Sequence, residues 1–227
     1  PDTTKGIMLD VIIALLPASA FGCILFGIRA FAVLVTCVTA AVLSEFIWNK
    51  ILKKPNTLGD LSAIVTGLLL GLNLSSETPL WMAAVGSIFA IIIVKQLFGG
   101  IGCNIVNPAI TARVMMLVSF SGAMTKFIEP VSDAVCSATP LVSTEAVSAK
   151  NLFFGMHSGC IGETSSFLLL VGGIYLVIRR VISPVTPVCF IGTVAILSLI
   201  SGESLAVSVF GGGLMLGAIF MATDYTT

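Results

Sequence analysis

The sequence predicts an all-α integral membrane protein built as an inverted repeat of transmembrane helices, and three observations support this. Of the 227 residues, 57% are hydrophobic and only 10% are charged, whereas about a quarter are charged in an average soluble domain. The mean hydropathy is +1.11. The apolar residues form long runs, and a glycine pattern in the first half of the chain recurs in the second. A soluble protein is disfavoured because few polar residues remain to cover a surface.

The apolar runs predict eight spans, since a membrane-crossing helix needs about 20 mostly apolar residues. The predicted spans are 11–28, 30–48, 61–74, 80–98, 101–120, 166–178, 187–200 and 205–222. They divide the chain into a first membrane repeat of five spans (1–120), a polar loop (121–165) and a second, incomplete repeat of three spans (166–227).

Lysine and arginine residues predict the orientation, because they are enriched in cytoplasmic loops. With a cytoplasmic N-terminus, seven lie inside and three outside, which places the 121–165 loop on the extracytoplasmic face. The inside residues are Lys5, Lys50, Lys53, Lys54, Lys95, Arg179 and Arg180, and the outside residues are Arg29, Lys126 and Lys150.

The repeat is visible as Gly67-Leu-Leu-Leu-Gly71, which recurs as Gly213-Leu-Met-Leu-Gly217 in the third span of each half. Two repeats with an odd number of spans are inverted in the membrane, as in many transporters. A complete second half would add two spans after Thr227. The chain also starts without a methionine, so we expect the natural protein to extend beyond both ends.

The fifth span is expected to be discontinuous. Gly99, Gly100 and Gly102 disfavour a helix, and Asn107-Pro108 has the residue types of an N-cap and a first helical position. The helix should therefore begin near Ala109 and direct its positive end into the protein. An ordinary loop between the fourth and fifth spans is the alternative.

Charged residues within or beside the spans are candidate functional groups. Arg113 lies one turn into the fifth helix, and a lipid-facing arginine is costly, so it should meet a partner or an anionic ligand, unless it extends to the interface. Glu45, Asp60 and Asp224 lie near span ends and are candidates for an ion path. The alternative for all three is an ordinary position at a span boundary.

The 121–165 loop contains a candidate modification site at Thr139. Pro140 favours an extended conformation for the threonine, and the small residues Ser137 and Ala138 leave its hydroxyl accessible to a large reagent. By itself, this pattern is also typical of a simple turn.

The segment Asp133-Ala-Val-Cys-Ser-Ala-Thr139 resembles the flavin-attachment motif of the RnfD/NqrB family, D-x-x-(S/T)-G-A-T. Asp133, Ala138 and Thr139 match it, whereas Cys136 and Ser137 replace the usual Ser/Thr and Gly. Segments 8–17, 59–71, 95–113, 159–165 and 221–224 are similar to further family segments, so the resemblance covers nearly the whole chain.

The resemblance implies ten spans in two inverted halves, similar to urea transporters, and an FMN whose phosphate is esterified to Thr139. It implies a membrane component, inactive alone, of a redox-driven Na⁺ or H⁺ pump of the Rnf type, a ferredoxin:NAD⁺ oxidoreductase in a bacterial or archaeal cytoplasmic membrane. The implied partners are the lipid bilayer and the A, B, C, E and G subunits of the Rnf complex, above all the flavin-bearing G and the membrane-embedded A and E. The expected flavin-site residues are Thr139, Asp133, Ser137, Ala138, Pro140, Arg113, Asn107, Glu163 and Thr164.

Several alternatives stay open. They are the B subunit of Na⁺-translocating NADH:quinone oxidoreductase, a passive channel of the urea-transporter type, and a structural anchor. Glu163 and Thr164 fit ordinary helix capping as well as flavin contact, and His157 is expected as a solvated loop residue. A second, noncovalent flavin such as riboflavin and a disulfide between Cys136 and Cys160 remain undecided. No basic run indicates nucleic acid, and the six cysteines show no metal-binding spacing.

Overall fold

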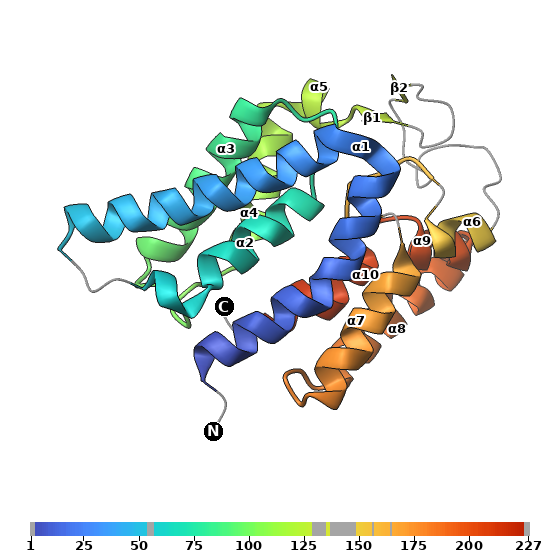
Figure 1. The fold of residues 1–227 in the computed structure, drawn as a ribbon. Coiled ribbons are helices and arrows are strands. Elements are labelled where there is room, and N and C mark those ends of the chain that lie inside the picture. Colours follow the sequence, from blue (N-terminus) through green and yellow to red (C-terminus); the bar gives the residue numbers. More distant parts are fainter. Residues whose placement is uncertain are drawn as a thin grey trace.

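The computed structural model describes residues 3–53, 57–128, 135–136, 149–155, 157–163 and 165–224, and these are mostly helical, as predicted (Figure 1). The helices are α1 Thr4–Ile51, α2 Ser62–Leu72, α3 Leu80–Phe89, α4 Pro108–Ser119, α5 Ser121–Met124, α6 Ala149–Phe154, α7 Ser166–Ile178, α8 Val185–Ser201, α9 Leu205–Phe210 and α10 Leu214–Leu216. A short 3₁₀ helix, η1 Leu58–Asp60, precedes α2, and π-helical segments η2 Ala90–Gln96 and η3 Gly217–Met221 extend α3 and α10.

Helix α1 contains the first two predicted spans as two arms joined by a sharp bend. Its 48 residues would extend about 72 Å if straight, more than twice the roughly 30 Å hydrocarbon core of a bilayer. At Gly27 the backbone has φ 71° and ψ −159°, a conformation that glycine adopts without steric cost. The two arms diverge from this bend (Figure 1). The predicted boundary between the first two spans was Arg29, two residues after the observed bend.

Helix α1 is also the only helix in the described ranges that is both long and apolar enough to cross a membrane, with a mean hydropathy of 2.4 over its most apolar window. The other apolar helices are shorter. Large apolar side chains on the outside are highly exposed, among them Ile24, Ile28 and Val118 at 81%, 79% and 80%. Exposed apolar surface on this scale marks an interaction site in a soluble protein and matches a lipid-facing surface here.

Helices α2 and α4 are short. Helix α2 has 11 residues, nearly all buried, and a Cβ atom on Gly67 would lie only 2.8 Å from the Cys37 carbonyl oxygen of α1. The glycine therefore allows the two backbones to approach closely. Helix α4 begins at Pro108 after a non-helical segment in which Gly99, Gly100 and Gly102 all have positive φ. The predicted non-helical entry of the fifth span, 101–120, and the predicted start of its helix are confirmed.

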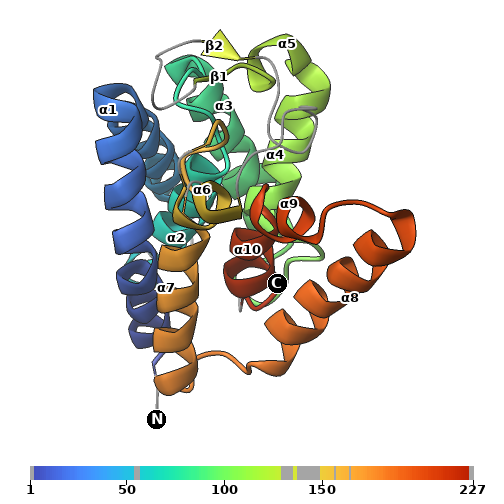
Figure 2. The same cartoon turned by 90° about the vertical axis from the view of Figure 1, so that its right-hand side faces the viewer.

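The second half of the chain matches the prediction in α7 and α8 and differs from it in the last predicted span. That span, 205–222, was predicted from its apolar run, and in the structure its first helix, α9, ends at Phe210 and the span resumes as α10 and η3. Three consecutive glycines, Gly211–Gly213, lie at the break, and each costs about 1 kcal/mol relative to alanine in a helix. Helix α8 stands at the edge of the bundle (Figure 2), and of its residues only Pro187 and Ser198 are buried.

The core joins the two halves. The largest apolar cluster combines residues of α1, α2, α4, α7 and η3, such as Leu15, Leu70, Met116, Leu169 and Ile219. The first arm of α1 packs on α7, where Asp10 accepts hydrogen bonds from Tyr175 (2.9 Å) and from Arg179 Nη2 (3.1 Å). The other arm packs on α2 and α3, so α1 connects the halves and brings α2, α4 and the α9–α10 break together.

Candidate functional site

The predicted flavin-bearing residues lie outside the described part of the chain. These are Asp133, Ser137, Ala138, Thr139 and Pro140, and Thr164 is also outside it. The described segments around them form a short antiparallel pair between β1 (Phe127–Ile128) and β2 (Val135–Cys136). Strand β1 follows α4 and α5, and β2 ends one residue before Ser137. The segment that returns from the loop, 157–163, is described and reaches the protein interior.

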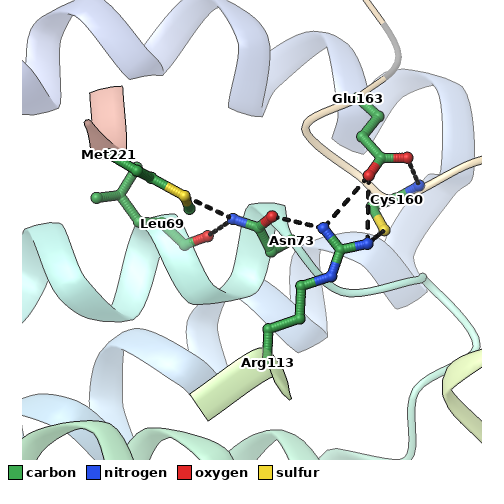
Figure 3. A network of polar contacts seen from close by, with 6 residues as sticks. All are labelled: Leu69, Asn73, Arg113, Cys160, Glu163 and Met221. Carbon is green, nitrogen blue, oxygen red and sulfur yellow. Dashed lines mark hydrogen bonds and ion pairs between the residues drawn. The ribbon is translucent and has the colours of Figure 1, made fainter. Parts of the chain in front are cut away.

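Arg113 of α4 is the centre of a polar network in that interior (Figure 3). Its Nη1 donates to Asn73 Oδ1 at 2.7 Å, and both Nη atoms lie 3.4 Å from Glu163 Oε1. Nη2 also lies 3.3 Å from Cys160 Sγ. Arg113 therefore points at protein groups, and the buried carboxylate of Glu163 balances its charge.

Local backbone structure holds the partners of Arg113 in place. Asn73 is the C-cap of α2, and its Nδ2 donates to Leu69 O at 2.8 Å. The returning segment pairs with the end of α2, because Ile161 N donates to Leu74 O (2.9 Å) and Gly162 N to Leu72 O (2.7 Å). These bonds place Glu163, which accepts a hydrogen bond from Cys160 N at 3.2 Å.

The network also touches the second half of the chain. Asn73 Nδ2 lies 3.7 Å from Met221 Sδ in η3. A Cβ atom on Gly213, at the start of α10, would lie 3.1 Å from Glu163 Oε1 and 3.3 Å from Arg113 Nη1. The sequence singled out Arg113 and Glu163 separately and missed Asn73 and Cys160. The one signal for Gly213 was its place as the first glycine of the repeated motif.

Two residues of the returning segment, Cys160 and His157, are buried. Cys160 carries a free thiol, and burial raises the pKa of this thiol well above its usual range. It is therefore protonated and unreactive at neutral pH. His157 was expected in solvent but is buried at 4% exposure, and burial lowers the pKa of its imidazole. It lies in the segment that is tied to α2 by backbone hydrogen bonds, which explains its burial.

Phe153 of α6 is used in packing. Its ring lies 5.4 Å from that of Phe154, 5.9 Å from that of Phe167 and 5.5 Å from that of Phe210. This aromatic cluster attaches the returning end of the loop to α7 and α9.

A second polar contact joins the interrupted helices of the two halves. Asn107 accepts hydrogen bonds from Ala109 N (3.0 Å) and Ile110 N (3.2 Å) and so caps α4. Its Nδ2 donates to Asp224 Oδ2 at 3.0 Å. Asp224 thus lies beside the positive N-terminal end of α4, a favourable position for a carboxylate. Both groups of the Asn107 amide are engaged by protein, which leaves its predicted role as a flavin contact without support.

A third polar cluster is centred on Glu45 and Lys95, whose side chains are 0% and 1% exposed. Lys95 Nζ donates to Glu45 Oε2 at 2.7 Å and to Ser62 Oγ at 2.6 Å. The sequence placed Lys95 on the cytoplasmic side and indicated Glu45 as a candidate for the ion path or an ordinary boundary residue, but it did not predict that the two side chains pair in the interior. Each side chain neutralises the other, which makes the burial of both possible.

The remaining members of this cluster surround a cavity. Thr57 Oγ1 donates to Glu45 Oε1 at 2.5 Å. Asp60 Oδ1 accepts from Ser62 N (2.9 Å) and Ser62 Oγ (2.6 Å), so Asp60 binds the first residue of α2, and Ser62 bridges Asp60 to Lys95. The adjoining cavity has a volume of about 400 Å³ and is lined by Glu45, Asn49, Thr57, Asp60, Lys95, Gln96, Gly99, Gly100 and Ile101.

Comparison with known proteins places this architecture in a family. Residues 1–227 match the NQR2, RnfD, RnfE family. The chain is 46% identical over 234 residues to the D subunit of the Na(+)-translocating ferredoxin:NAD(+) oxidoreductase complex of Acetobacterium woodii, an alignment that covers 99% of this chain and 74% of the relative. It is 40% identical over 250 residues to the D subunit of the proton-translocating ferredoxin:NAD(+) oxidoreductase complex of Clostridium ljungdahlii, covering 100% and 76%. For the D subunit of the ion-translocating oxidoreductase complex of Rhodobacter capsulatus the identity is 35% over 270 residues, covering 99% and 75%. The chain is a membrane protein that belongs to the NQR2, RnfD, RnfE family.

Proposed function

We propose that this protein is the D-type membrane subunit of an Rnf complex, which couples electron transfer from ferredoxin to NAD⁺ to the movement of Na⁺ or H⁺. The observation that carries the proposal is the similarity, over 99% or more of the chain, to the D subunits of ferredoxin:NAD(+) oxidoreductase complexes. These names favour an Rnf protein over the B subunit of Na⁺-translocating NADH:quinone oxidoreductase. They also favour a redox function over a passive channel or a structural anchor. The working partners are the A, B, C, E and G subunits of the same complex.

The residues around Thr139 fit a covalently bound FMN. Its hydroxyl is the proposed attachment point, Ser137 and Ala138 before it have small side chains, Asp133 matches the first position of the motif, and Pro140 follows the threonine. When bound, FMN supplies a carrier of one or two electrons. The described ends of the loop, β1–β2 and the 157–163 segment, attach this region to α5 and α2.

Arg113 and Glu163 act in this proposal as a positioning pair. Because the Glu163 carboxylate already neutralises Arg113 at 3.4 Å, an anionic group would have to displace it to bind the arginine. The pair instead fixes the returning end of the loop on α4 and α2. Thr164 follows Glu163 directly and remains a candidate flavin contact, and a second flavin such as riboflavin remains an additional candidate.

The ion path is proposed to use three acids of the two interrupted regions, the buried Glu45 and the partly buried Asp60 and Asp224. Asp224 faces Asn107 at the start of α4. Glu45 and Asp60 both line the cavity of about 400 Å³ and are linked through Lys95 and Ser62. Unwound backbone at the ends of half-helices supplies the ion sites of many transporters. The short α2 and the interrupted α9–α10 each carry a copy of the glycine motif. This supports the 5+5 inverted repeat, similar to urea transporters, with the 121–165 loop on the extracytoplasmic side.

Covalent flavin is tested with the complex purified from cells that contain the flavin-attachment enzyme. The protein is separated from its partners under denaturing conditions, and its flavin fluorescence is compared for wild type, Thr139→Ala and Thr144→Ala. Thr144 lies in the same loop and is the matched control. We expect fluorescence in wild type and Thr144→Ala and none in Thr139→Ala. Undiminished fluorescence in Thr139→Ala would exclude Thr139 as the attachment site.

A further inference from the structure

The buried Glu45–Lys95 pair has the geometry of an occupied cation site. The ammonium of Lys95 is a compact point charge with three donors, and it binds a carboxylate oxygen at 2.7 Å and a hydroxyl oxygen at 2.6 Å. The Thr57 hydroxyl lies at the other Glu45 oxygen, and Asp60 lies beyond Ser62. Carboxylate and hydroxyl oxygens are also the ligands that hard cations prefer.

A purely structural role explains this pair poorly. Removing two charges from water is costly, and a buried ion pair is commonly no more stable than apolar side chains of similar size. This pair also adjoins a cavity of about 400 Å³ whose lining includes Glu45, Thr57, Asp60 and Lys95 themselves. A small ion can therefore reach the carboxylate through that cavity.

The backbone that carries Lys95 is suited to movement. Lys95 lies in the π-helical segment η2. π-Helical turns are rare in proteins overall, and those that occur are often found at functional sites. Directly after it come Gly99 and Gly100, both with positive φ, and Gly100 N donates to Lys95 O at 3.0 Å. The same segment leads to Asn107 and α4, which carries Arg113. A shift of η2 would therefore move Lys95 and the start of α4 together.

We propose that Lys95 is a tethered cation that occupies a site for a monovalent cation at Glu45, and that the transported Na⁺ or H⁺ competes with its ammonium for the carboxylate. The proposal rests on the proposed ion-pumping function and specifies one step of it. With Lys95 on Glu45 the pair is neutral and the site is closed. When the ammonium moves away, the carboxylate accepts one cation from the cavity, which faces the cytoplasm in the proposed orientation. The return of Lys95 expels that cation.

The test uses the whole complex in sealed vesicles, with ferredoxin-driven uptake followed by ²²Na⁺ and, separately, by a pH-sensitive dye. Removing the tethered charge in Lys95→Met should lower the half-saturating concentration of the transported cation by about tenfold, the effect of 1.4 kcal/mol. It should also lower the maximal rate of uptake, because the charge that expels the cation is missing. Lys50→Met is the matched control, because Lys50 is an exposed lysine near the end of the α1 arm that carries Glu45. An unchanged or higher half-saturating concentration in Lys95→Met would overturn the proposal.

Lys95→Met leaves the buried Glu45 without a counter-charge and could therefore misfold. A second variant separates an effect on folding from an effect on cation binding. Glu45→Gln/Lys95→Met removes both charges, and covalent flavin content reports whether the complex assembles. We expect an assembled complex without cation uptake. Wild-type uptake in this double variant would show that the pair is structural only. If the wild-type complex itself takes up neither Na⁺ nor H⁺, the proposed pump function fails, which is a different result from uptake by the double variant.

Discussion

Gly213 in the second half of the chain lies directly against Arg113 in the first: a Cβ atom on this glycine would be 3.3 Å from Nη1 of the guanidinium and 3.1 Å from Glu163 Oε1. The interrupted helix of the second half thus packs against the ion pair that Arg113 of the first half forms with Glu163 of the loop. Any side chain at position 213 has to push against this pair.

Gly213→Ala should therefore destabilise the protein. Overpacking in a close-packed interior typically costs about 1–3 kcal/mol, and the thermal midpoint of the purified complex should fall. Gly192→Ala in α8 is the matched control, because a Cβ atom there meets nothing within 4 Å. Equal midpoints for both variants would contradict the proposed close packing at position 213.

The two partners of the Arg113–Glu163 pair should respond unequally to substitution. Glu163 is 5% exposed, whereas the Arg113 side chain is 31% exposed. Arg113→Met leaves a buried carboxylate without a counter-charge and should cost on the order of 2–4 kcal/mol, whereas Glu163→Gln should cost less. Arg113→Met/Glu163→Gln should be more stable than Arg113→Met alone. Thermal melting of the four proteins measures this, and additive losses would argue against the pair.

Burial of His157 predicts a pH dependence of stability. Because burial lowers the pKa of this imidazole below its ordinary value of 6.5, the unfolded chain binds the proton more readily than the folded protein. Stability should be independent of this group well above pH 6.5 and should fall as the pH drops below it. His157→Gln should remove this part of the pH dependence in melting curves recorded from pH 8 to 5. An identical pH profile for wild type and variant would show that His157 titrates normally.

The Asn107–Asp224 contact predicts a difference between two conservative changes. Asn107→Asp keeps an N-cap residue for α4 but faces the Asp224 carboxylate with a second one, so it should be destabilising, whereas Asp224→Asn keeps a hydrogen-bonding amide there. If Asp224 is part of the ion path, Asp224→Asn should lower ferredoxin-driven ion uptake while covalent flavin is retained. Undiminished uptake would exclude Asp224 from the path.

Features that depend on neighbouring residues could be predicted from the sequence. The start of α4 follows from Asn107 and Pro108, since capping is a local effect, and the bend in α1 follows from the break between apolar runs near Arg29. The position of the interruption at Gly211 could not be predicted, because a glycine run inside an apolar segment fits either a weak helix or a break.

Features that depend on distant partners could not be predicted. The partner of Lys95 is Glu45, 50 residues earlier, and local sequence does not indicate this pairing. The environment of Arg113 likewise depends on Asn73 and Glu163, which are 40 and 50 residues away. His157 is buried because its segment pairs with the end of α2, and nothing in its local sequence indicates this.

The most direct test of the account is peptide mass analysis of the native protein. Trypsin should release residues 127–150 as one peptide, because the chain has no lysine or arginine between Lys126 and Lys150. The account predicts that this peptide carries the mass of one FMN less one water and that fragmentation places it on Thr139. An unmodified peptide from the active complex, or a flavin on another residue such as Thr144, would contradict it.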